Sequence, residues 1–292
     1  MSLAMWPTDP PQVTADDAAK ACAAGIRDKA LRDAVTAARQ DFSANSIRFQ
    51  AVAAIDELHT VVSGDYAVTN LSKAELTDLY SKQIARSNSP ARKAIYEVLL
   101  GAAPMGRCVY CREGDPRTLD HYVPKALVPG LAIDPWNLVP ACRDCNMQLG
   151  DGYSGEAQEQ FLHPYFLGPL GRWLRAEVVQ TTPPDLRFHA DPDAGLSTEV
   201  ATRIVYQFNR LKLGSRYSKR CATEVTGLGR ILPSRFDGCA PCEVRDFLKE
   251  QAEIGFADDD NDRRAVMFEA LAASDWYCEG GYLTPVTRPP TP

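Results

Sequence analysis

The stretch CVYCREGDPRTLDHYVPKALVPGLAIDPWNLVPACRDCN, residues 108–146, decides the fold of this chain. It opens with Cys108 and Cys111 and closes with Cys142 and Cys145, so that two C-x-x-C motifs enclose 30 residues. Each motif presents two thiolates to one ion, and two such motifs together are typical of a four-cysteine zinc site. The sequence therefore predicts one structural zinc held by these four cysteines.

The other cysteines and the N-terminus indicate the compartment. The chain has nine cysteines, an odd number, and its N-terminal sequence lacks the charged region and long apolar core of a signal peptide. We therefore expect a cytoplasmic protein without disulfides. The alternatives for the C-x-x-C pairs are unrelated free thiols or a redox pair, although no βαβ pattern supports the latter. Irregularly spaced cysteines leave a second zinc site as an alternative to reduced thiols: Cys221, Cys239, Cys242 and Cys278.

Between the two cysteine pairs, the sequence predicts two short strands, TLDHYVP (118–124) and WNLVPA (136–141). A short helix then carries CRDCNMQLG (142–150). Asp120 and His121 are neighbours in the first strand, so their side chains should point to opposite faces and serve different purposes. A unit this small buries too little apolar surface to hold its shape, and zinc binding supplies the missing stability.

The flanks of this unit read as mainly helical, which predicts an α+β protein that is mostly α. We expect a helical region over 13–104, the cysteine-framed unit over 105–168 and a mainly helical C-terminal region over 169–283. The first of these is rich in alanine with apolar residues at helical spacing, a pattern that continues through SIRFQAVAAIDELHTVV (46–62). Ser72 with Glu75 three residues later is typical of a capping box at a helix start. Disorder is expected at both ends, over 1–12 and 284–292.

Composition limits the function classes. Hydrophobic residues make up 45% and charged residues 24% of the chain, as in soluble globular proteins, and no apolar run is long enough to span a bilayer. The net charge of −6 means that nucleic-acid binding must use a local basic patch. Lys125 and Arg143, inside the cysteine-framed unit, are the candidates for touching nucleic acid. The basic segment 203–220 reads first as a solvated helix face and second as a phosphate contact.

The order of these motifs resembles the HNH endonuclease family. C-x-x-C is followed by Leu119-Asp120-His121, then by Asn137-Leu138-Val139-Pro140, then by C-x-x-C with Asn146 directly after it. The likeness covers roughly 105–168 and implies a ββα-metal fold of the kind framed by zinc knuckles. The stretches CVYC, LDHYVPKA, NLVPACRDCN and FLHPYF also look like stand-alone bacterial HNH proteins linked to phage defence, such as the Septu-type HNH partner.

The resemblance implies a role for each residue. His121 would be the general base, and Asp120 with Asn146 would bind a catalytic divalent ion. Asn137 would hydrogen-bond to backbone and fix the loop that orients His121. Many relatives carry a lysine three residues after the helix asparagine, where this chain has Leu149, which puts one phosphate contact in doubt.

The chemistry of these residue types agrees with that reading. Hydrolysis of a phosphodiester needs an activated water and neutralisation of the charge that builds on the phosphate. An imidazole can take the proton, and a carboxylate with an amide oxygen suits Mg²⁺ or Mn²⁺. The leading hypothesis is a metal-dependent endonuclease acting on double-stranded DNA, and the resemblance also implies an activating ATPase partner. The alternative is a zinc-stabilised module that binds nucleic acid or protein without catalysis.

Overall fold

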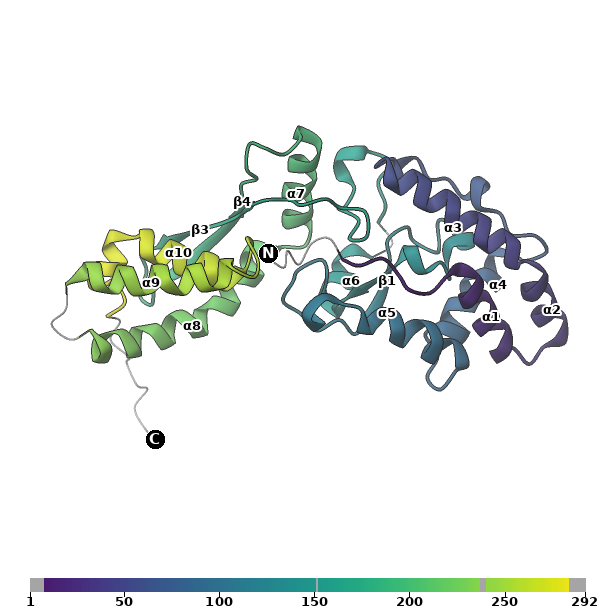
Figure 1. Cartoon of the computed structure of the whole chain (residues 1–292), viewed down its shortest axis with the longest axis horizontal. Helices are drawn as coiled ribbons and strands as arrows, with labels where there is room; N and C mark the ends of the chain where they lie inside the picture. Colours follow the sequence, from purple (N-terminus) through teal and green to yellow (C-terminus); the bar gives the residue numbers. More distant parts are fainter. Residues whose placement is uncertain (1–7, 151, 237–239, 284–292) are drawn as a thin grey trace. The chain divides into compact units, whose positions relative to one another are not determined.

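The computed structural model describes residues 8–150, 152–236 and 240–283 of the chain (Figure 1). The chain divides into two compact units, with the boundary between Gly168 and Pro169. Both units combine several helices with one pair of short strands, which confirms the predicted α+β class with its excess of helix. Within the described residues, no helix is both long and apolar enough to cross a membrane.

The first unit starts with helices whose ends are capped by side chains. The Thr14 hydroxyl accepts a hydrogen bond from the Asp17 N–H, and the Asp17 carboxylate accepts one from the Thr14 N–H. Ser72 and Glu75 form the same capping box at the start of α4, as the sequence predicted. The α-helices before the strands are α1 (Ala15–Gly25), α2 (Lys29–Ala37), α3 (Arg39–Ala54), α4 (Lys73–Asp78) and α5 (Glu97–Gly101).

Two π-helical turns interrupt the regular helices of this unit: η3 (Leu79–Ile84) directly follows α4, and η4 (Arg92–Tyr96) directly precedes α5. Shorter 3₁₀ turns complete the unit: η1 (Leu58–Thr60), η2 (Ser63–Tyr66), η5 (Pro104–Gly106), η6 (Pro129–Leu131), η7 (Pro135–Asn137) and η8 (Ala157–Glu159). Helix α3 ends at Ala54, earlier than the helical pattern suggested, because Asp56 adopts a left-handed φ of 62° that ends a helix.

The two predicted strands pair antiparallel as β1 (Thr118–His121) and β2 (Leu138–Ala141), and α6 (Arg143–Leu149) follows. His121 lies opposite Leu138, and Thr118 lies opposite Ala141. Helix α6 contacts β1, and α5 contacts both strands. The order strand, strand, helix is the ββα arrangement that the resemblance implied.

One hydrophobic core joins the N-terminal helices to the cysteine-framed segment. Leu119, Ile133 and Leu138 belong to the same cluster of buried side chains as residues of α1, α2 and α3 and of the π-helical turns. Leu138 and Ile133 are at most 1% exposed. The segment with the strands is therefore part of a larger folded unit rather than an independent domain.

The second unit builds on a β-hairpin of β3 (Leu174–Val179) and β4 (Asp185–Ala190). Helix α8 contacts β4 and α10 contacts β3, while α9 packs against α10. Helices make up most of the rest of this unit: α7 (Thr198–Arg210), α8 (Leu213–Arg235), α9 (Pro241–Phe256), α10 (Arg263–Ala273) and the π-helical turn η9 (Tyr277–Gly281).

The predicted disordered ends lie largely outside the described residues, which begin at Thr8 and stop at Leu283. Thr8 itself is buried, and its N–H donates to the carbonyl of Pro164.

Candidate metal centre and active site

The four cysteines of the two C-x-x-C motifs come together in the first unit. Cys142 is the N-cap residue of α6 and Cys145 lies in its first turn, while Cys108 and Cys111 lie on the turn before β1. All four are buried, and their sulfur atoms lie within 4.8 Å of one another. The Sγ atoms of Cys111 and Cys142 are 3.8 Å apart. Tetrahedral zinc with Zn–S bonds of about 2.3 Å places sulfurs about 3.8 Å apart, so the cluster fits zinc.

The first cysteine knuckle depends on a close approach at Gly114. The Cys108 N–H donates to the Gly114 carbonyl at 2.8 Å, and the Gly114 N–H donates to Cys111 Sγ at 3.4 Å. A Cβ atom at Gly114 would lie only 2.7 Å from Cβ of Cys142. Hydrogen bonds from Cys108 and the other two cysteines hold the pKa of Cys142 well below the usual value of a thiol. A thiolate is the form that binds a metal.

A pocket of about 330 Å³ lies at the end of β1. Four predicted site residues line it: Asp120, His121, Lys125 and Asn146. Side chains from outside the cysteine-framed segment line it too, among them Tyr80 of η3 and Tyr96 of η4. Neither Asn137 nor Arg143 is among its lining residues.

His121 is held by a backbone carbonyl. Its Nε2 lies 2.9 Å from the carbonyl oxygen of Ala132, and the side chain is part-buried. A carbonyl only accepts, so Nε2 carries the hydrogen and Nδ1 keeps its lone pair in the neutral ring. Burial lowers the pKa of His121 to about 3, so the ring is neutral at physiological pH. In this neutral ring, Nδ1 is the nitrogen that keeps a free lone pair.

Asp120 has different surroundings from its neighbour. Its Oδ2 accepts a hydrogen bond of 2.9 Å from the Tyr110 hydroxyl, which comes from inside the first cysteine motif. Burial raises the pKa of Asp120 to about 7, against the opposing effect of the Tyr110 hydrogen bond. Strand alternation gives Asp120 and His121 different partners, yet both line the same pocket because the strand ends there.

Asn137 is fully buried and binds the loop that follows β1. Its Oδ1 accepts from the Val123 N–H at 2.7 Å, and its Nδ2 donates to the carbonyls of Val123 and Leu131 at 3.0 and 3.1 Å. The Asn137 side chain thus occupies the backbone groups that Val123 would need to continue the strand. For this reason β1 ends at His121, short of the predicted end at Pro124. Leu131 precedes Ala132, whose carbonyl holds His121.

Helix α6 carries one cysteine of the four-cysteine cluster and one residue of the pocket lining. Asn146 lies directly after Cys145 and is partly exposed at the pocket. Leu149, at the position where many relatives have lysine, is buried. Arg143 is exposed on α6, away from the pocket lining, and Lys125 places its Nζ 5.6 Å from the centre of the Tyr80 ring.

The weaker candidates of the sequence have other surroundings. His163 is 3% exposed and packs among aromatic rings, with ring centres 4.4 Å from Tyr122 and 4.9 Å from Phe166. Among the described residues, the only group of metal-ligating side chains is the four-cysteine cluster. Cys221 lies 2.8 Å from a guanidinium nitrogen of Arg263, and Cys242 is exposed on α9. Cys239 lies outside the described residues.

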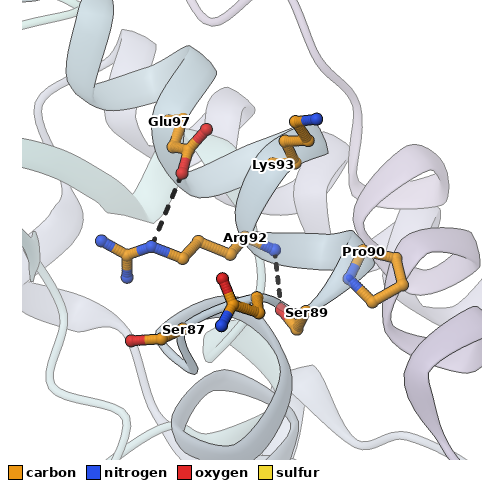
Figure 2. A pocket seen from close by; sticks show the side chains of 7 residues that line it. Ser87, Ser89, Pro90, Arg92, Lys93 and Glu97 are labelled. Atoms are coloured by element: carbon orange, nitrogen blue, oxygen red, sulfur yellow. Dashed lines mark hydrogen bonds and ion pairs between the residues drawn. The ribbon is translucent and has the colours of Figure 1, made fainter.

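A larger hollow of about 610 Å³ opens beside the first turn of the helix that contains η4 (Figure 2). Arg92 dominates it: its Nε lies 3.6 Å from a Glu97 oxygen, and its backbone N–H donates to the Ser89 hydroxyl. Glu97 is the only acidic residue that lines this hollow, and no cysteine or histidine does. The lining of this hollow offers neither a set of metal ligands nor a histidine that could act as a base. The smaller pocket is therefore the candidate active site.

The prediction from the sequence did not include three groups that shape this pocket. Tyr110 binds Asp120, Tyr80 lies against His121, and the Ala132 carbonyl fixes the imidazole. Tyr110 could have been found, since it lies inside a cysteine motif. Tyr80 carries no such signal, because 40 residues separate it from His121 in the sequence.

Comparison with known proteins agrees with this geometry. Residues 108–152 match the family model of the HNH endonuclease. Protein ea31 of Escherichia phage lambda is 30% identical to this chain over 167 residues. That match covers 56% of this chain and 56% of the relative, so the chain aligns with about half of that protein's length. No solved structure matches the chain.

Proposed function

We propose, from the premise that residues 108–152 match the HNH endonuclease family model, that the protein is a metal-dependent endonuclease that hydrolyses phosphodiester bonds of DNA. The observation that carries the proposal is the single pocket lined by His121, Asp120 and Asn146. A base, a carboxylate and an amide oxygen are the groups needed to activate water and to hold Mg²⁺ or Mn²⁺. Double-stranded DNA is the expected substrate.

His121 acts as the general base. The Ala132 carbonyl holds Nε2–H, so Nδ1 takes the proton from the attacking water. Burial keeps the ring neutral, which is the form that accepts a proton, but it also lowers the pKa and so weakens the imidazole as a proton acceptor. Asn137 maintains this arrangement by binding both ends of the loop between Val123 and Leu131.

Asp120 and Asn146 would hold the catalytic divalent ion. Their oxygen atoms are ligands that Mg²⁺ and Mn²⁺ prefer, and the desolvation that raises the pKa of Asp120 would be offset by a nearby cation. The ion would neutralise charge that builds on the phosphate. Lys125 at the pocket and Arg143 on α6 would contact phosphate oxygens of the substrate.

Zinc at the four cysteines has a structural role. The four sulfurs leave no open coordination position for a water or a substrate, which distinguishes a structural from a catalytic zinc. Because α6 carries both Cys145 and Asn146, the zinc fixes the position of the proposed catalytic ligand.

We extend the proposal to bacterial antiviral defence in the cytoplasm, where the four thiols stay reduced. Its support is the resemblance of the cysteine and histidine motifs to stand-alone HNH proteins of that kind, which also suggests an ATPase partner. Co-purification with an ATPase expressed beside it would test the partnership.

The test of the nuclease is nicking of supercoiled plasmid DNA in the presence and absence of Mg²⁺ or Mn²⁺. Withholding the divalent ion is preferable to EDTA, because EDTA also removes zinc. His121→Ala should slow single-turnover cleavage by about 10² to 10⁴-fold while zinc content and DNA binding persist. His189→Ala, which removes an exposed histidine from β4, is the matched control and should cleave normally.

The second candidate function is a zinc-stabilised binding module, favoured by the completeness of the cysteine cluster alone. DNA binding without metal-dependent cleavage, in the wild type and in His121→Ala alike, would support this module and reject the nuclease. Cleavage of RNA but not DNA would keep the chemistry and change the substrate.

A further inference from the structure

Tyr80 contacts the proposed base from outside the HNH domain. Its ring meets the His121 imidazole edge to face, with ring centres 4.3 Å apart and planes at 72°. Its hydroxyl donates to the carbonyl of Leu119 at 3.0 Å. Burial raises the pKa of Tyr80, so the phenol remains a neutral donor. One side chain therefore contacts both the imidazole and the strand that carries it.

The contact restrains the imidazole on a second side. The Ala132 carbonyl binds Nε2–H, and the Tyr80 ring covers another part of the ring. With both contacts in place, rotation of the His121 side chain is hindered and Nδ1 keeps one direction. The centre of the Tyr80 ring also lies 5.6 Å from Nζ of Lys125. The ring is therefore beside the lysine side chain that we propose contacts phosphate.

The backbone at Tyr80 departs from α-helical geometry, and this affects the direction of the Tyr80 side chain. The Tyr80 carbonyl accepts from the Ala85 N–H at 2.8 Å, which is the five-residue hydrogen bond of a π-helical turn. Helix α4 therefore widens at Tyr80 instead of continuing in α-helical register. Such turns are rare and recur at functional sites.

We propose that Tyr80 is a positioning residue that holds the His121 imidazole with Nδ1 available to water. The inference rests on the proposed role of His121 as the base. Tyr80 touches neither a metal nor the reacting atoms in this assignment. Its effect on the reaction is transmitted by the orientation of the imidazole ring and by the anchored strand β1.

The test compares three variants with the wild type. Tyr80→Leu removes the ring, Tyr80→Phe keeps the ring and removes the hydroxyl, and Tyr165→Leu is the control. Tyr165 is equally suited as a structural match, because its hydroxyl donates to the carbonyl of Leu138, the residue that faces His121 across the sheet. It is buried and lies outside the pocket lining.

The first measurement is single-turnover cleavage at saturating DNA, beside a DNA-binding titration. Tyr80→Leu should lose about 10 to 100-fold in rate with unchanged DNA affinity, since a small misplacement of a catalytic group has effects of this size. Tyr80→Phe should recover most of the rate. Tyr165→Leu should lower the unfolding midpoint without lowering the rate. If Tyr80→Leu loses zinc or cooperative unfolding, Tyr80→Met replaces it.

The second measurement does not need activity. A long-range ¹H–¹⁵N spectrum of labelled histidine reports which imidazole nitrogen carries the hydrogen, and His121→Ala assigns the signal among four histidines. The Nε2–H form should dominate in the wild type, Tyr80→Phe and Tyr165→Leu, and should mix with the other tautomer in Tyr80→Leu.

The outcomes separate the two proposals. If His121→Ala is inactive while Tyr80→Leu cleaves normally, positioning by Tyr80 is rejected and the nuclease stands. If the wild type cleaves nothing with either divalent ion, the nuclease is rejected and the tautomer signal alone decides about Tyr80. An unchanged tautomer in Tyr80→Leu would then overturn the inference.

Discussion

At the scale of single residues, burial shifts the pKa values of Asp120 and His121, two adjacent residues of β1, in opposite directions. It raises the pKa of Asp120 to about 7 and lowers that of His121 to about 3, because it disfavours the charged form of each. A base should be neutral, which burial ensures for His121, but the same burial reduces the affinity of the imidazole for a proton. A metal ligand should be charged, so a proton and the proposed divalent ion would compete for Asp120.

Removing either proposed ligand should weaken the catalytic ion and spare the zinc. Asp120→Ala and Asn146→Ala should each raise the Mg²⁺ or Mn²⁺ concentration for half-maximal cleavage by at least about tenfold, since even outer contacts to a metal site matter by that much. Elemental analysis should still find one zinc per chain in both variants, because thiolates hold it. An unchanged titration in both would remove Asp120 and Asn146 from the metal site.

Asp134 is a second buried carboxyl, on the loop that Asn137 holds. Its Oδ1 accepts from the Ser46 hydroxyl at 2.9 Å and from the Trp136 N–H at 3.2 Å. Its Oδ2 has no hydrogen-bond partner among the described residues. Burial raises its pKa from 3.8 to about 7. Between these pH values the folded protein keeps a proton that the unfolded chain has released, so stability from this group is complete below pH 3.8 and is lost as the pH rises through about 7.

Asp134→Asn should therefore flatten the pH dependence of stability. A single group of this kind contributes a slope of about −1.4 kcal/mol per pH unit to the free energy of unfolding within its window. Urea unfolding of wild type and variant at pH 5, 6 and 7 should give free energies that converge or cross as the pH rises. Parallel curves would show that Asp134 is ionised in the folded protein.

At the scale of elements, we expect α6 to depend on zinc at the four cysteines. It has seven residues, too few for a stable isolated helix, and its N-cap is a cysteine without a side-chain cap hydrogen bond. Cys111→Ser should lose the zinc, and hydrogen exchange should then accelerate in β1, β2 and α6. Cys242→Ser, at an exposed cysteine of α9, should keep zinc and protection. Equal zinc content in both variants would mean that the four-cysteine site has been misread.

A substitution at Gly114 tests how closely the four-cysteine cluster is packed. An alanine Cβ would meet Cys142 at 2.7 Å, so Gly114→Ala should displace a zinc ligand and speed zinc loss to a competing chelator at least about tenfold. Gly64→Ala is the matched control, since nothing lies within 4 Å of its added Cβ. Similar chelation rates for the two variants would indicate that the knuckle yields without moving Cys142.

The elements that were predicted correctly are those encoded locally. The capping box at Ser72 and the cysteine spacing depend on residues a few positions apart. The end of β1 and the π-helical turn at Tyr80 depend on contacts across the fold, and neither could be predicted. Asn137 stops the strand from 14 positions away, and Tyr80 meets a carbonyl 39 positions away.

At the scale of the whole molecule, the first unit is the part that should fold alone. Its core joins α1 to β2, and each residue that lines the candidate active site lies before Gly168. A fragment of residues 1–168 should bind zinc and unfold cooperatively in urea. A fragment of residues 105–168 should not, because Leu119 and Leu138 would lose their helical neighbours. Calorimetry and zinc analysis of both fragments would check this, and a stable shorter fragment would contradict the shared core.

The candidate site also contains residues that could be predicted from local sequence and residues that depend on contacts across the fold. The cysteines, Asp120, His121, Asn137 and Asn146 all lie within 39 consecutive residues, and their types point to chemistry without knowledge of the fold. The tyrosines that complete the pocket come from helices that precede this segment. Both residues are tyrosines of the region before the strands, so only the folded structure separates the partly buried Tyr80 from Tyr66, which is buried and does not line the pocket.

The tyrosines beside β1 also affect whether a strand from a second copy of the chain can pair with β1. Among the described residues β1 pairs with β2 alone, so its other edge has no strand beside it. Exposed edges of this kind recruit strands from other chains and lead to aggregation. Here the hydroxyls of Tyr80 and Tyr96 donate to the carbonyls of Leu119 and Arg117, which occupies backbone acceptors along that edge. A strand beside the pocket that we propose binds DNA is in this way protected from pairing with a strand of a second copy.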